Sequence, residues 1–259
     1  YNTAEIKKGI EKAHREEVQL LCFPELSITA YSCGDLFLQK ALQEKALESL
    51  LELARFMEDR PSMLVIVGLP LRIRNRLYNV AAVVSNEGIL GIVPKAYLPN
   101  HNEFYEKRWF SPAASMDCDS VCIHGNEVPL SAEGVIFNTP FSRFGVEICE
   151  DLWMPVPPSS KLAMEGAEVI FNLSASNELV GKHAYRKSLI AQQSGRCHAA
   201  YIYAAAGPGE SSTDTVFSGS CMIAENGAIL TESERFSLDS IWAIADIDVE
   251  ALRYDRLNN

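Results

Sequence analysis

A carboxylate, an amine and a thiol each follow an apolar, strand-like segment of this 259-residue sequence. Glu25 follows VQLLCF, Lys95 follows ILGIV and Cys149 follows RFGVEI. Open α/β sheets carry their functional sites outside the carboxyl ends of their strands. If the three strands are neighbours in one sheet, the three side chains meet at one edge. They then form a chemically complete set for attack on an amide.

The chemistry of such a set follows from the ionisation of its groups. A thiol has a pKa of about 8.5, so at neutral pH most of Cys149 is in the poorly nucleophilic protonated form. A carboxylate such as Glu25 takes this proton during attack and passes it to the leaving ammonia. The ammonium group of Lys95 stabilises the oxyanion on the attacked carbonyl. Residues 150–153 (EDLW) predict a helical turn whose backbone N–H groups add oxyanion donors.

Each of the three residues also has a structural interpretation. Cys149 is one of seven cysteines, and most cysteines in apolar segments are small buried hydrophobes. Glu25 and Lys95 each follow a proline, which also suits a surface charge at the start of a loop. Strand-end placement alone leaves the catalytic and the structural interpretations open.

The pattern of apolar residues predicts alternating strands and helices in one α/β domain over residues 1–259, with strands covered on both faces. Helices are expected at 3–17, 38–58, 159–166 and 181–197, and strands at 18–23, 63–70, 77–84, 89–93, 134–137, 143–149, 168–174, 199–206 and 241–248. A Glu-Asn-Gly turn predicts a further hairpin within 218–230, and the stretch from about 98 to 130 is expected to be irregular.

The composition excludes several classes of function. The net charge of −11 and the lack of a Lys/Arg run argue against nucleic-acid binding. No apolar stretch approaches the roughly 18 residues of a membrane span, and the amino end lacks the features of a signal peptide. An odd number of cysteines without a CxxC pair favours a reducing, cytoplasmic setting over a disulfide framework.

Three longer segments resemble the nitrilase superfamily of carbon–nitrogen hydrolases and, within it, the glutaminase domains of glutamine-dependent NAD synthetases. They are CFPELSITAYSCGDLF (22–37), PKAYLPNHNEFYEKRWFSP (94–112) and GVEICEDLWMPVPPS (145–159). NLSASNELVGKHAYR (172–186) and GPGESSTDTVFSG (207–219) also fit, so the resemblance runs over nearly the whole chain. It places the family's Glu-Lys-Cys triad on Glu25, Lys95 and Cys149.

The same resemblance assigns further residues to the site. Glu106 matches a second family glutamate that supports the lysine and the substrate amide, while Trp153 and Ser176 fall where the family lines its glutamine pocket. Their structural alternatives are a solvated loop charge, a core aromatic and a turn former. His101 stands where relatives often have a tyrosine near the pocket.

The resemblance also implies a fold, a reaction and partners. The fold is a four-layer αββα sandwich that associates into homo-oligomers. The reaction hydrolyses glutamine through a cysteine thioester and supplies ammonia for the amidation of deamido-NAD to NAD. The partner is a synthetase domain in cis that holds ATP and Mg²⁺, so no cofactor is expected here. Because the Ser-Gly-Gly-x-Asp-Ser phosphate loop of that domain is missing, we expect the chain to be a fragment of a longer synthetase.

Two other functions remain open from the sequence. A free-standing amidase of the same superfamily would act on another small amide, and a non-catalytic nitrilase-like scaffold would need no intact triad. Cys118, Cys122 and His124 do not have the spacing of a structural zinc site, so no metal is expected. Lys182 and Arg186 lie one helical turn apart and form either a solvated face or part of the pocket.

Overall fold

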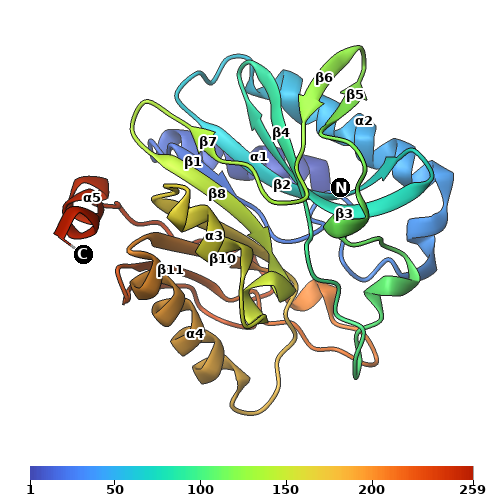
Figure 1. Ribbon diagram of the computed structural model, residues 1–259. Coiled ribbons are helices and arrows are strands. Elements are labelled where there is room, and N and C mark those ends of the chain that lie inside the picture. Colours follow the sequence, from blue (N-terminus) through green and yellow to red (C-terminus); the bar gives the residue numbers. More distant parts are fainter. Residues whose placement is uncertain (259) are drawn as a thin grey trace. The chain divides into compact units, whose positions relative to one another are not determined.

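The computed structural model describes residues 1–258, so Asn259, the last residue of the predicted domain, lies outside the described residues. The chain divides into two compact units, Tyr1–Glu133 and Gly134–Asn259. Each unit contains one main β-sheet with α-helices packed against it (Figure 1).

The sheet of the first unit has the strand order β1-β2-β3-β4. β1 pairs with β2 in parallel, whereas β2–β3 and β3–β4 are antiparallel. Therefore β1, β2 and β4 run in the same direction and their carboxyl ends lie at the same end of the sheet. The strands are β1 (Leu20–Cys22), β2 (Leu64–Ile73), β3 (Arg76–Ser85) and β4 (Gly88–Pro94).

Two amphipathic helices, α1 (Asn2–Arg15) and α2 (Lys40–Met57), belong to this unit. The buried residues of α2 recur at helical spacing, so its apolar stripe packs on β2, β3 and β4 while α1 packs beside it (Figure 1). β3 is buried at every residue after the first, as expected for a strand whose two faces are both out of solvent.

The stretch from about 98 to 130 is not wholly irregular as predicted. It contains the short 3₁₀ helices η2 (Glu106–Arg108) and η3 (Ala113–Ser115) and a hairpin of β5 (Ser120–Ile123) with β6 (Asn126–Pro129). His124 and Gly125 both have positive φ, 48° and 86°, as a two-residue hairpin turn of the primed type requires. The sequence pattern misses this hairpin because His-Gly is an uncommon turn pair.

The sheet of the second unit has the order β12-β11-β10-β9-β8-β7. β8, β9 and β10 are parallel neighbours, and β7, β11 and β12 extend the sheet in antiparallel fashion. The strands are β7 (Phe137–Asn138), β8 (Arg143–Ile148), β9 (Val169–Ser174), β10 (Ala200–Ala205), β11 (Cys221–Glu225) and β12 (Ala228–Glu232).

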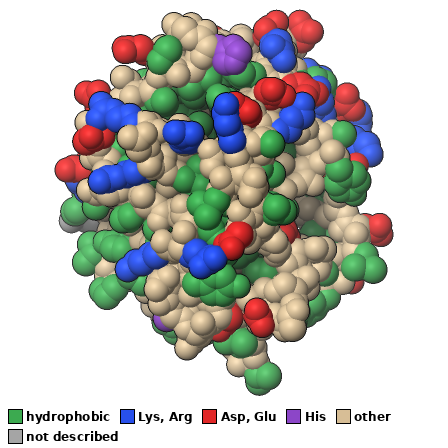
Figure 2. Space-filling model, turned by 90° about the vertical axis from the view of Figure 1, so that its right-hand side faces the viewer, with side chains coloured by type: hydrophobic (Ala, Val, Ile, Leu, Met, Phe, Trp, Pro, Cys, Tyr) green, Lys and Arg blue, Asp and Glu red, His purple; other side chains and the backbone are tan. Residues whose placement is uncertain are grey.

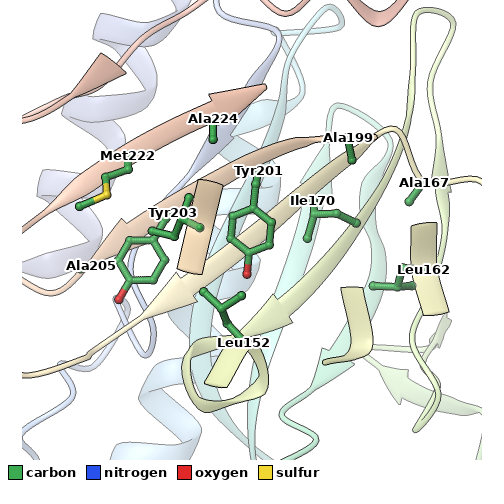
Figure 3. Packing of buried hydrophobic residues seen from close by; sticks show 11 residues of the cluster. Leu152, Leu162, Ala167, Ile170, Ala199, Tyr201, Tyr203, Ala205, Met222 and Ala224 are labelled. Carbon is green, nitrogen blue, oxygen red and sulfur yellow. The ribbon is translucent and has the colours of Figure 1, made fainter. Parts of the chain in front are cut away.

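Helices α3 (Pro158–Met164) and α4 (Lys182–Cys197) cover this sheet, with α3 on β8 and α4 on β10, β11 and β12. Side chains of the helices and strands form one apolar cluster, in which Leu162 and Tyr201 are fully buried (Figure 3). A Cβ at Gly145 of β8 would lie 2.8 Å from Leu162 Cδ1. The glycine is therefore needed for α3 to approach β8 this closely.

Three expectations about this unit are wrong or incomplete. Residues 241–248 form no strand although apolar residues alternate there; the segment has no paired neighbour and Ile244 is 47% exposed. The strand expected at 134–137 is reduced to β7. A helix that the sequence did not predict, α5 (Val249–Asn258), follows this segment. It buries one residue, Leu252, so its sequence has no apolar stripe that would predict a helix.

The three strands that precede Glu25, Lys95 and Cys149 do not share one sheet. β1 and β4 lie in the sheet of the first unit, and β8 lies in that of the second. The reason is the connection from β8 through α3 to β9, which pairs β8 in parallel with the next apolar strand along the chain.

Candidate active site

The first unit brings Glu25 and Lys95 into direct contact. Both follow strands whose carboxyl ends lie at the same end of the sheet. The backbone N–H of Lys95 donates to the carbonyl of Asn79 on β3 at 2.9 Å, which continues the β3–β4 pairing past the end of β4. Lys95 Nζ then lies 2.6 Å from Glu25 Oε1, and neither side chain is exposed.

Glu106 completes a buried cluster around the lysine. Lys95 Nζ lies 2.7 Å from Glu106 Oε1 and 2.9 Å from Glu106 Oε2. The hydroxyl of Tyr31 donates to Glu106 Oε1 at 2.8 Å. The structure therefore places Glu106 against Lys95, rather than among solvated loop charges.

The two oxygens of the Glu25 carboxylate have different surroundings. Oε1 accepts from Lys95 Nζ and from Asn79 Nδ2, both at 2.6 Å. Oε2 is buried and has no hydrogen-bond partner. Two donors thus fix the orientation of the carboxylate through one oxygen, while the other oxygen retains its full capacity to accept a proton.

Burial and charge act in opposite directions on Glu106. Burial raises its pKa to about 7, the charge of Lys95 lowers the pKa, and the neighbouring charge of Glu25 raises it again. One ammonium is shared between two carboxylates in a site out of solvent, and the cost of burying the second negative charge favours a proton on Glu106.

In the second unit, Cys149 lies at the junction of β8 and the 3₁₀ helix η4 (Cys149–Trp153). Its φ of 47° is in the left-handed region, which costs a non-glycine residue on the order of 1 kcal/mol. Sharp strand-to-helix turns of this kind present nucleophiles in hydrolases. The predicted helical turn after Cys149 is confirmed.

Two backbone N–H groups at this turn are already hydrogen-bonded within the unit. Cys149 N–H donates to Asn172 Oδ1 at 3.2 Å, and Ile148 N–H donates to Asp151 Oδ2 at 2.9 Å. The N–H groups of Ile148 and Cys149 are therefore not available as oxyanion donors, because each already donates to a side chain of the unit.

Trp153 and Ser176 lie near the same end of the second sheet. Trp153 ends η4, with its ring 5.6 Å from that of Tyr185 and Lys182 Nζ 5.2 Å from its centre. Ser176 is two residues beyond the carboxyl end of β9, the parallel neighbour of β8, and is buried.

Arg186 does not belong to a solvated face. Its side chain is fully buried and donates to Glu178 Oε1 at 2.6 Å and to the Asn177 carbonyl at 2.9 Å. It therefore anchors the segment between β9 and α4 to the helix.

Other residues considered from the sequence lie at the surface. His101 is exposed and packs its ring edge-on to Phe104 at 6.4 Å. Cys122 is exposed on the β5–β6 hairpin. Over residues 1–258, no group of three or more His, Cys, Asp and Glu residues is arranged to hold a metal ion.

Sequence reasoning missed Asn79, Tyr31 and Asn172. Asn79 and Asn172 are buried polar residues within the apolar strands β3 and β9, and an isolated asparagine in such a run is a usable signal of a polar partner. Tyr31 lies in a loop, and its sequence neighbours give no such signal.

Charged side chains of both signs are mixed on the face shown in Figure 2, where Lys and Arg lie among Asp and Glu. Across the described residues, none of the helices combines the length and the apolar character that crossing a membrane would require.

Comparisons with known proteins identify the family of the chain. The sequence profile of the carbon-nitrogen hydrolase family matches residues 1–256. The chain is 42% identical over 258 residues to the glutamine-dependent NAD(+) synthetase of Mycobacterium tuberculosis, covering 99% of this chain and 38% of that protein. It is 30% identical over 265 residues to the rat protein of the same name, covering 97% and 36%. The chain thus spans about two fifths of the length of these curated relatives.

Solved structures show the same fold. The glutamine-dependent NAD(+) synthetase of Cytophaga hutchinsonii matches with a TM-score of 0.83 and 32% identity, over 94% of this chain and 39% of that one. An amidase of the nitrilase superfamily from Nesterenkonia AN1 matches with a TM-score of 0.76 and 16% identity, over 99% and 88%. The predicted α/β fold of the nitrilase-like kind is confirmed. With its family profile matched over 1–256, the chain belongs to the carbon–nitrogen hydrolase family.

Proposed function

We propose that this chain is a glutaminase domain that hydrolyses glutamine to glutamate and ammonia through a thioester on Cys149. The observation that carries the proposal is the asymmetric environment of Glu25: Oε1 is held by Lys95 and Asn79, and Oε2 is buried without a partner. A carboxylate oriented in this way is prepared to remove a proton from a thiol and to return it to a leaving group.

In the proposed reaction, Glu25 Oε2 takes the proton from Cys149 Sγ as the sulfur attacks the side-chain amide carbon of glutamine. The charge of Lys95 stabilises the oxyanion that forms. The proton on Glu25 passes to the amide nitrogen, the carbon–nitrogen bond breaks and ammonia leaves a glutamyl thioester. Glu25 then removes a proton from water, which attacks the thioester and releases glutamate, and the proton returns to the Cys149 sulfur.

Glu106 has a separate part in this proposal. It holds Lys95 through both carboxylate oxygens and is itself oriented by the Tyr31 hydroxyl. We assign it to positioning the lysine and the substrate amide. Trp153 and Ser176 are assigned to lining the glutamine pocket, supported by their location near the carboxyl ends of β8 and β9.

Glutamine is the proposed substrate because the relatives at 42% and 30% identity are named as glutamine-dependent. By the same similarity, we propose that the ammonia serves the amidation of deamido-NAD at a synthetase domain in the same polypeptide, where ATP and Mg²⁺ would bind. In the proposed reaction no cofactor takes part in this domain, because the nucleophile, the base and the cation are all side chains.

Three further properties are proposed at the level of the whole molecule. Both units, residues 1–259, form one carbon–nitrogen hydrolase domain, supported by a family match that spans them. The protein is a homo-oligomer, as the family resemblance implies. It is cytoplasmic, supported by seven cysteines without a CxxC pair.

The test is glutamine turnover, measured as glutamate release, in the wild type, Cys149→Ala and the matched control Cys221→Ala. Cys221 is the first residue of β11 in the same unit, and its thiol donates to the Gly219 carbonyl. We expect C149A to lose at least about a thousandfold in kcat and C221A to retain it. Turnover that survives C149A contradicts the proposal, and faster hydrolysis of simple aliphatic amides than of glutamine would favour a general amidase.

A further inference from the structure

A chain of buried polar side chains lies directly beside the Cys149 turn in the second unit. Asn172 on β9 accepts from Cys149 N–H at 3.2 Å, and its Nδ2 donates to the Tyr201 hydroxyl oxygen at 3.1 Å. Tyr201 on β10 donates its hydroxyl hydrogen to Glu147 Oε1. Glu147 on β8 also accepts from Ser159 N–H, at 2.7 Å. The network thus connects all three parallel strands of this sheet.

None of these side chains has appreciable access to solvent. Asn172 and Tyr201 are 0% exposed and Glu147 is 1% exposed. Figure 3 shows Tyr201 within the apolar cluster that includes Leu152 of η4, with its hydroxyl on the same face of β10 as that of Tyr203. Burying a carboxylate, a phenol and an amide in an apolar cluster is costly unless each is satisfied. Apolar residues at these positions would stabilise the fold more simply, which points to a role beyond stability.

The direction of the hydrogen bonds is set at the Glu147 end of the network. Tyr201 donates its one hydroxyl hydrogen to Glu147 Oε1, so the phenol oxygen is left to accept. Burial raises the pKa of Tyr201 well above its usual value, so the phenol keeps the proton that it donates. The Tyr201 oxygen can then only accept a hydrogen bond, so the NH₂ end of the Asn172 amide, and not its oxygen, faces Tyr201. This orientation turns the amide oxygen of Asn172 toward the N–H of Cys149.

The N–H that Asn172 accepts from belongs to Cys149, whose backbone is in the left-handed region. A non-glycine φ of 47° persists only where the surroundings fix it. The bond from Asn172 holds the amide of Cys149, and Asp151 holds the amide of Ile148 on the preceding residue. If the Asn172 amide were reversed, its NH₂ group would face the N–H of Cys149, and two donors would oppose each other.

We propose that Glu147, Tyr201 and Asn172 act as positioning residues for Cys149, fixing the backbone turn from which its sulfur attacks the substrate. The inference deepens the proposed glutaminase function and rests on Cys149 being its nucleophile. Tyr201 and Glu147 act through Asn172 and touch no reacting atom.

A double-mutant cycle tests this chain of contacts. Tyr201→Phe, Asn172→Ala and the double variant are compared for the rate at which iodoacetamide alkylates Cys149 across pH, quantified by mass spectrometry of the Cys149 peptide. Tyr78→Phe is the matched control, since Tyr78 is a buried tyrosine whose hydroxyl contacts Ser115 of the first unit. Denaturant unfolding is measured for each variant, so that loss of stability is separated from loss of positioning.

We expect Y201F and N172A each to slow alkylation of Cys149 about tenfold to a hundredfold and to change its pH profile, with Y78F unchanged. Because Tyr201 acts through Asn172, adding Y201F to N172A should slow the alkylation of Cys149 little further. The Cys149 amide should also exchange its hydrogen faster in Y201F than in the wild type, which remains measurable if N172A fails to fold.

Alkylation of Cys149 in Y201F at the wild-type rate and pH profile would overturn the proposal, and so would fully additive losses in the double variant. Failure of the proposed function is distinguishable: wild-type protein would then show no glutamine turnover dependent on Cys149, whatever the alkylation rates of the variants.

Discussion

Lys95 Nζ lies 2.6 Å from Glu25 Oε1 and 2.7 Å from Glu106 Oε1, and all three side chains are essentially out of solvent. One buried cation therefore serves two buried carboxylates. Removing the cation leaves the buried carboxyl groups of Glu25 and Glu106 without a countercharge, which costs far more than the loss of an exposed ion pair.

We predict that Lys95→Met destabilises the protein by about 3–5 kcal/mol in denaturant unfolding and abolishes glutamine turnover. The triple variant E25Q/K95M/E106Q should recover most of the stability and no activity, because it removes the buried charges together. Lys45→Met, which breaks the exposed pair of Lys45 with Glu48, serves as control and should cost less than about 1 kcal/mol. A K95M protein as stable as K45M would show that the cluster is not buried.

The raised pKa of Glu106 predicts how stability changes with pH. Its pKa rises from 4.5 to about 7 on folding, chiefly through burial. A folded state that binds the proton more tightly than the unfolded state has its added stability fully present below about pH 4.5, and loses it as pH rises to about 7. We expect a loss of roughly 3 kcal/mol between pH 4.5 and 7.5 from this group.

Glu106→Gln should remove most of that slope. Unfolding curves at several pH values for the wild type and E106Q measure the difference directly. If the free energy of unfolding changed with pH in the same way in both proteins, folded Glu106 would not bind a proton more tightly than unfolded Glu106.

Asn79 is expected to affect catalysis through Glu25. Its Nδ2 donates to Glu25 Oε1 at 2.6 Å and helps to direct Oε2 away from Lys95. Asn79→Ala should lower kcat by about tenfold to a hundredfold and leave KM for glutamine within a few-fold, because a base is misoriented while substrate contacts remain. A pure rise in KM would assign Asn79 to substrate binding instead.

The carboxy-terminal helix α5 is held by arginine side chains at the opposite end of the second sheet from Cys149. Arg256 Nε donates to the His198 carbonyl at 2.9 Å, and its Nη2 donates to the Cys197 carbonyl at 3.0 Å. Arg256→Ala should lower the free energy of unfolding by about 1–3 kcal/mol and speed proteolytic cleavage within residues 241–258. The exposed Tyr254 on the same helix provides the control Tyr254→Phe, and equal cleavage of the two variants would contradict the anchoring role.

The sequence located the strand ends well because apolar runs that stop at Pro24 and Pro94 are local signals. The contact of Glu25 with Lys95 also depends on β1 and β4 running in the same direction, which strand-end reasoning anticipated. It wrongly allowed β8 a place in the same sheet, because strand partners are decided by chain connections and not by the composition of each strand.

Other features of the site depend on contacts between distant residues, which one sequence does not encode locally. Glu106 was found only through family resemblance, since nothing in a polar loop distinguishes one glutamate from another. Asn79 reaches Glu25 across 54 residues and Tyr201 reaches Glu147 across 54 residues. The prediction of a strand at 241–248 is wrong for a related reason. Alternating apolar residues favour an extended backbone, but a strand also needs a neighbouring strand to pair with, and the local sequence does not show whether one is there.

The most direct test of the account is to treat the protein with an electrophilic analogue of glutamine and map the covalent adduct by mass spectrometry. The chain contains seven cysteines, so the position of the adduct discriminates sharply. We predict one adduct per chain, on Cys149, that excess glutamine prevents and that E25Q slows. An adduct on any other cysteine, or labelling of Cys149 that glutamine does not prevent, would contradict the proposed glutaminase.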